Sequence, residues 1–85
     1  MTAEELTGIF RTNLQALRIA NKLSQRDLAA KSGIMQSHLS ALERGATRPN
    51  LHTLVRLATA LGVPAWRLLQ PLAEENNFSA PLDVD

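Results

Sequence analysis

The sequence predicts an all-α domain, and three observations lead to this fold class. Leucine and alanine supply most of the 45% hydrophobic content, whereas aromatic residues make up only 4% of the chain, a composition that favours helices over sheets. Apolar residues recur at three- and four-residue intervals, as on one face of a helix. A glycine follows three of these periodic stretches, where a residue in the left-handed conformation can close the last helical turn. Together they predict four or five helices.

The first helix is predicted to begin after Thr2 and to end near Asn21. Thr2 stands three residues before Glu5, which is the spacing of a capping box. The face expected to be buried carries Leu6, Phe10, Leu14 and Leu17.

Two short helices follow, over residues 25–32 and 36–44, with a turn at Gly33 between them. Ser24 and Asp27 form a second capping pair at the start of the first of these helices. The positions expected to hold the two helices against the core are Leu28, Ala29, Ile34, Leu39 and Leu42.

A fourth helix is predicted over residues 51–61, and a short fifth helix from Ala65 to about Gln70. Asn50 caps the fourth helix, because its side chain can accept a hydrogen bond from the first turn. Its apolar stripe is predicted to consist of Leu51, Leu54, Leu57, Ala58 and Leu61. We therefore divide the chain into a helical domain, residues 1–71, and an acidic tail, residues 72–85, that is irregular or forms an interface.

The charges divide the chain in the same way. All nine lysines and arginines lie between Arg11 and Arg67, and the only acids in that span are Asp27 and Glu43, so its net charge is +7. The other six acids lie outside it. A basic body of this kind is typical of a surface that binds phosphates.

Several function classes are disfavoured by what the sequence lacks. There is no cysteine, so disulfides, thiolate metal sites and cysteine nucleophiles are excluded. His38 and His52 have no clustered partners that would predict a metal site, and no pattern indicates an enzyme or a cofactor. No apolar run approaches the ~20 residues of a membrane span, so we expect a soluble, cytoplasmic protein with no membrane partner.

The stretch from Leu17 to Leu69 resembles the lambda-repressor-like helix-turn-helix family, the Cro/C1 or XRE type. The segments SQRDLAAKSG, SALERG and RPNLHTL carry the resemblance. It implies a five-helix fold in which residues 36–44 lie in the major groove of double-stranded DNA. It also implies a homodimer on a pseudo-palindromic operator and a role as a transcriptional regulator, repressor-like in kind.

The resemblance also implies roles for individual residues. Base edges would be read by Gln36, Ser37, Ser40 and Ala41. Phosphates would be contacted by Gln25, Arg44 and Arg48. Arg18 and Glu43 match a structural salt bridge between the first and third helices.

The residues themselves are consistent with the proposed reading face. If Leu39 and Leu42 face inward, then Gln36, Ser37 and Ser40 face outward together with Ala41 and Arg44. Glutamine can pair with adenine, serine with several bases, and alanine only with a thymine methyl group. The sequence departs from the family at Met35, which cannot cap the helix, and at Ala41, where a longer polar reader is common.

A dimer interface is expected on the fifth helix and the tail, since the other helices are committed to the core and to DNA. The apolar residues available there are Trp66, Leu69, Leu72 and Phe78. The competing interpretation is that Trp66 covers the protein's own core. A phage repressor, a restriction-modification controller and an antitoxin are all compatible with the sequence, and the alternative class is a protein-interaction module that binds a partner through its tail.

Overall fold

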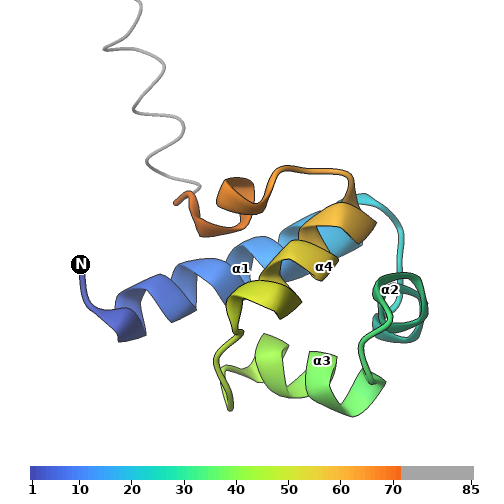
Figure 1. Cartoon of the computed structure of the whole chain (residues 1–85), viewed down its shortest axis with the longest axis horizontal. Helices are drawn as coiled ribbons and strands as arrows, with labels where there is room; N and C mark the ends of the chain where they lie inside the picture. The colour runs from blue at the N-terminus through green and yellow to red at the C-terminus, as the bar shows by residue number, and fades with distance from the viewer. Residues whose placement is uncertain (72–85) are drawn as a thin grey trace, which may run out of the picture.

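The computed structural model describes residues 1–71, which form four α-helices and one short 3-10 helix (Figure 1). No strand occurs in this part of the chain, so the predicted all-α fold class is confirmed. The elements in chain order are α1 (Ala3–Ala20), α2 (Gln25–Ser32), α3 (Gln36–Arg44), α4 (Leu51–Leu61) and the 3-10 helix η1 (Ala65–Leu69).

Two capping boxes begin α1 and α2, as predicted. The Thr2 hydroxyl accepts from the Glu5 backbone at 3.1 Å, and the Glu5 carboxylate accepts from the Thr2 backbone at 2.8 Å. Ser24 and Asp27 exchange the same pair of bonds at 2.9 and 3.0 Å. The bond from the backbone N–H of the cap residue lowers the pKa of both carboxyls, because it stabilises their charged form.

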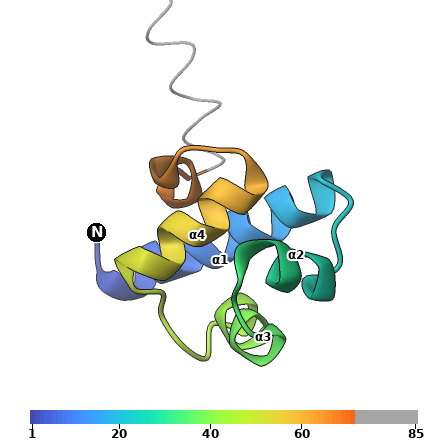
Figure 2. The same ribbon diagram turned by 45° about the vertical axis from the view of Figure 1, so that its right-hand side comes forward.

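The core joins these helices into one body. η1 packs on α1 and α4, α3 packs on α1 and α2, and α2 packs on α4. Two views show η1 and α3 on opposite sides of α1 and α4 (Figures 1 and 2). The apolar side chains at its centre that are exposed by 1% or less are Phe10, Leu14, Leu28, Leu39, Leu42, Leu57 and Leu68.

The fifth element differs from the prediction, because it is a 3-10 helix and not an α-helix. Its backbone bond from Arg67 N–H to the carbonyl of Pro64 spans three residues, at 3.0 Å. Only six residues separate Pro64 from Pro71. So short a segment makes few α-helical bonds, and the tighter 3-10 turn is the usual form of such pieces.

The buried amide of Asn13 holds this short helix in place. Its side chain is 1% exposed and donates to the carbonyls of Leu68 and Gln70 at 3.0 and 2.7 Å. These bonds satisfy carbonyls that a helix of this length leaves without partners.

Leu51 is the other difference, since its side chain is 79% exposed. It occupies the first position of α4, at one end of the helix, whereas Leu54, Leu57 and Leu61 farther along are buried. The helical period correctly predicted the buried face of α4, and it did not show where along the helix the core ends. No helix in residues 1–71 is long and apolar enough to span a membrane.

Candidate nucleic-acid interface

α3 has one buried and one open face. Leu39, Leu42 and Glu43 are 3% exposed or less, and they fix the inner side of the helix. Gln36, Ser37 and Arg44 are exposed, whereas Ser40 and Ala41 are half-buried. The outer face therefore presents the five side chains expected there, with the two at the middle partly covered.

The N-terminus of α3 carries no side-chain cap. Met35 occupies the cap position with extended backbone and makes no capping bond, and its side chain is 74% exposed. A thioether accepts hydrogen bonds only weakly, so the first N–H groups of α3 have no partner from the cap residue. The missing cap was expected from the sequence, where Met35 departs from the family at this position.

The C-terminus of α3 is held by Arg11 of α1. One guanidinium nitrogen of Arg11 donates to the carbonyl of Arg44 at 3.2 Å. Gly45 follows with φ +76°, and a Cβ there would lie 2.7 Å from the same nitrogen. Glycine adopts the left-handed backbone without strain, and its lack of a Cβ leaves room for the Arg11 guanidinium. Sequence reasoning missed Arg11, since nothing in the chain near position 11 indicates a contact 33 residues away.

Arg18 and Glu43 lie together at the junction of α1 and α3. The Arg18 guanidinium donates to both carboxylate oxygens of Glu43, at 2.7 and 3.1 Å, and also to the carbonyl of Leu23 at 2.9 Å. The exposed fractions of the two side chains are 16% and 3%. This paired geometry fixes the tilt of α3 relative to α1.

Gln25 is part of the same cluster. Its amide nitrogen donates to a Glu43 oxygen at 3.0 Å, while Gln15 of α1 donates to the Glu43 carbonyl at 2.8 Å. Three helices thus meet at one residue of α3. A phosphate contact by Gln25 stays a prediction, with its amide nitrogen already bonded to Glu43 in this structure.

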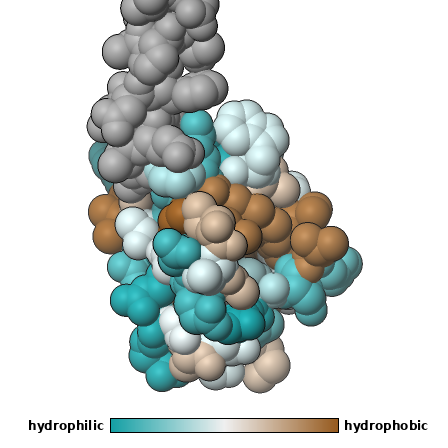
Figure 3. All heavy atoms as spheres, turned by 90° about the vertical axis from the view of Figure 1, so that its left-hand side faces the viewer, coloured by the Kyte–Doolittle hydropathy of each residue, from teal (hydrophilic) through white to brown (hydrophobic). Residues whose placement is uncertain are grey.

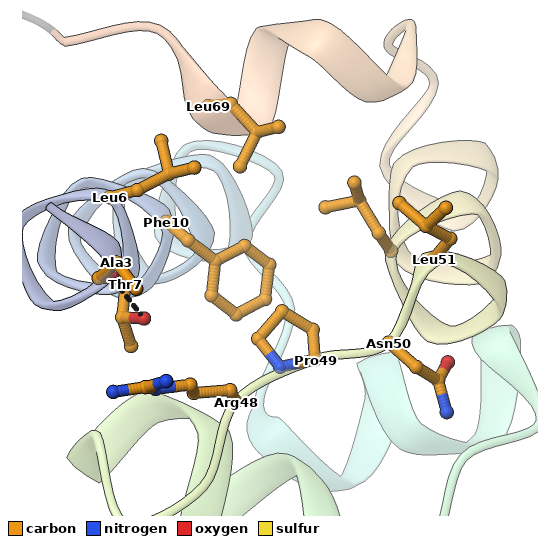
Figure 4. Close-up of a pocket in the computed structure, with 10 residues that line it drawn as sticks. Ala3, Leu6, Thr7, Phe10, Arg48, Pro49, Asn50, Leu51 and Leu69 are labelled. Carbon is orange, nitrogen blue, oxygen red and sulfur yellow. Dashed lines mark hydrogen bonds between the residues drawn. The ribbon is translucent and has the colours of Figure 1, made fainter. Parts of the chain in front are cut away.

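Arg48 lies in the loop between α3 and α4, where its side chain runs beneath the first turns of α1 (Figure 4). It forms an ion pair with Glu4 at 2.7 Å, and the exposed fractions of the two side chains are 58% and 76%. Sequence reasoning assigned no role to Glu4. Its partner lies 44 residues away, so no local pattern could have indicated the contact.

An apolar groove separates the start of α1 from the start of α4. Phe10 and Pro49 point toward one another there, with Leu51 on the α4 side and Leu69 of η1 above them (Figure 4). From the end at which α1 begins, apolar side chains form a band across the middle of the molecule (Figure 3).

The expected dimer residues divide into two groups. Trp66 is 63% exposed, so it does not cover the core, and Leu69 lines the apolar groove. Leu72 and Phe78 lie outside the described residues. Within residues 1–71, no group of three histidine, cysteine or acidic side chains could hold a metal ion.

Comparisons with known proteins agree with this geometry. The family model described as Helix-turn-helix matches residues 14–65. An uncharacterized HTH-type transcriptional regulator of Sinorhizobium fredii is 43% identical over 74 residues, which cover 87% of this chain and 92% of the relative. Some relatives are longer, and the chain spans 24% of one of them.

Two solved structures are also similar. A hypothetical transcription factor from Neisseria is 30% identical, covers 92% of this chain and 91% of its own, and superposes with a TM-score of 0.83. The restriction-modification controller protein C.AhdI from Aeromonas hydrophila is 38% identical. The match covers 71% of this chain and 91% of the controller, with a TM-score of 0.69.

Proposed function

Because the chain belongs to the helix-turn-helix family of transcriptional regulators, we propose that it is a sequence-specific, repressor-like regulator that reads the DNA major groove with α3 as a homodimer. In this proposal, residues 1–71 form the DNA-binding domain and residues 72–85 form an acidic tail. The likeness to a restriction-modification controller supports a regulatory role.

The observation that carries the proposal is the way α3 is held. Its inner face is buried and its polar outer face is open, while Glu43 receives bonds from Arg18 and Gln25. A helix fixed at this angle can enter the major groove as a rigid element, with Gln36 at the end that approaches base edges. Arg44 lies at the C-terminal end of α3 and Arg48 in the loop that follows. In this proposal both contact the phosphate backbone of the DNA.

Two copies are proposed because a single motif contacts only a few base pairs. The exposed Trp66 and the nearby Leu69 supply apolar surface on η1, and η1 lies on the side of α1 and α4 away from α3 (Figure 2). A two-fold pair would place the two recognition helices about 34 Å apart, one turn of DNA.

The test begins with selection of bound sequences from a random duplex pool, followed by affinity measurements on the selected operator and on unrelated duplexes. Gln36→Ala should weaken operator binding by about 1–3 kcal/mol per half-site and relax the preference at one base pair. Arg48→Ala is the matched control, since a phosphate contact contributes to all sequences alike.

Gln36→Ala tests recognition of bases, whereas Arg48→Ala tests contact with phosphates. If Gln36→Ala binds operator and unrelated duplexes as the wild type does, α3 is not the reader. If the wild type shows neither a preference nor a dependence on salt, the protein belongs instead to the alternative class of interaction modules, whose partner is a protein.

A further inference from the structure

A shallow hollow lies between the first turns of α1 and the loop that follows α3. Two cations, Arg11 and Arg48, and one acid, Glu4, line it together with Gly45. It is thus a positively charged recess next to the C-terminal end of α3.

We propose that Glu4 occupies in the free protein the place of a DNA phosphate in this hollow, and that it thereby lowers the affinity for every DNA sequence. The inference rests on the proposed function. It assigns to Glu4 the role of an internal competitor for Arg48, and to the hollow a phosphodiester group as its ligand.

The ion pair itself is suited to an exchange of partners. Its atoms lie 2.7 Å apart, yet both side chains are more than half exposed. Exposed pairs contribute little to stability, so the bond between Arg48 and Glu4 can be given up. This distinguishes it from the pair of Arg18 and Glu43, the other ion pair in the described part of the chain, whose carboxylate is buried.

The chemistry of the two acceptors explains the exchange. A carboxylate and a phosphodiester both offer a guanidinium two oxygens that accept its N–H bonds. The loop carrying Arg48 leaves the C-terminal end of α3, so it meets the DNA backbone when α3 lies in the groove. Glu4 then faces a phosphate of the same charge, and binding must overcome that repulsion.

Arg11 keeps the hollow positive throughout. Its guanidinium is bonded to the carbonyl of Arg44, and a carbonyl leaves the positive charge of the guanidinium uncompensated. With Glu4 removed, two cations and no acid would line the recess.

The test compares Glu4→Gln with Glu5→Gln. Both variants remove one exposed carboxylate from the first turn of α1, but Glu5 bonds to the Thr2 backbone and does not line the hollow. Glutamine also preserves the capping box. Affinity for a random-sequence duplex and for the selected operator is measured at several salt concentrations, after thermal melting has shown that both variants fold.

Glu4→Gln should tighten binding to both duplexes about three- to fivefold at low salt, with a salt slope steeper by up to about one. Glu5→Gln should change affinity much less. In an Arg48→Gln background, the gain from Glu4→Gln should shrink to that of the control.

Equal gains from the two substitutions would overturn the inference, because Glu4 would then act only through net charge. A gain that persists without Arg48 would overturn it as well. If no variant and no wild-type protein binds duplex DNA, the proposed function fails and the inference fails with it, an outcome easily told from the first two.

Discussion

Glu43 joins α3 to α1 and α2 through its carboxylate. Its carboxylate accepts from Arg18 and Gln25 while its side chain is only 3% exposed. A buried charge with three hydrogen bonds is stable only as long as its partners are present, and the same is true of the arginine that it neutralises.

Glu43→Ala should therefore lower the free energy of unfolding by about 2–4 kcal/mol, since it strands the Arg18 guanidinium in a half-buried site. Thermal or urea unfolding measures the loss. The control is Glu4→Gln, which breaks the exposed ion pair to Arg48 and should cost at most about 1 kcal/mol. An unchanged melting temperature in Glu43→Ala would contradict the role assigned to this cluster.

At the scale of the elements, the starts of α1 and α2 depend on carboxylates. The pKa of Glu5 and that of Asp27 are lowered by hydrogen bonds from the backbone of Thr2 and Ser24 respectively. A lowered pKa in the folded state means that the folded protein binds protons less readily than the unfolded chain. Stability from these boxes is therefore fully present above the ordinary carboxyl pKa and is lost as pH falls through the lowered value.

The melting temperature of the wild type should fall between about pH 5 and pH 3, because the unfolded carboxyls take up protons near pH 4. Glu5→Gln should flatten part of this dependence, since glutamine keeps the capping bond and does not titrate. The melting temperatures of the wild type and of Glu5→Gln are compared across this pH range. Parallel curves for the two proteins would show that the Glu5 box does not contribute.

At the scale of the whole molecule, self-association depends on the apolar residues that the fold leaves exposed. Trp66 is 63% exposed on η1, and an exposed tryptophan is a common anchor of an interface. The apolar area available is modest, so we expect weak dimers that DNA strengthens by holding both copies.

Trp66→Ala should reduce self-association in sedimentation experiments and should weaken occupancy of an operator with two half-sites. Val55→Ala provides the control, because Val55 is also apolar and 53% exposed but lies in a recess with Lys31 of α2. If Trp66→Ala dimerises and binds as the wild type does, η1 is not the interface.

Local sequence signals suffice to predict where α1, α2 and α4 begin and where α2 and α3 end. Thr2, Ser24 and Asn50 cap α1, α2 and α4, and Gly33 and Gly45 close α2 and α3. Each of these signals acts within one helical turn, so the residues that produce it are neighbours in the chain. The buried face of α3 could be predicted in the same way, because the spacing of Leu39 and Leu42 matches the period of a helix.

Which side chains the helices bring together depends on the tertiary structure. The contacts of Arg11 with the Arg44 carbonyl, of Arg48 with Glu4, and of Asn13 with the end of η1 join segments 33 to 57 residues apart. The same holds for the exposure of Leu51, because the helical period gives the direction of a side chain but not the extent of the core beneath it. Contacts of this kind depend on how the helices pack, and packing is a property of all the buried surfaces at once.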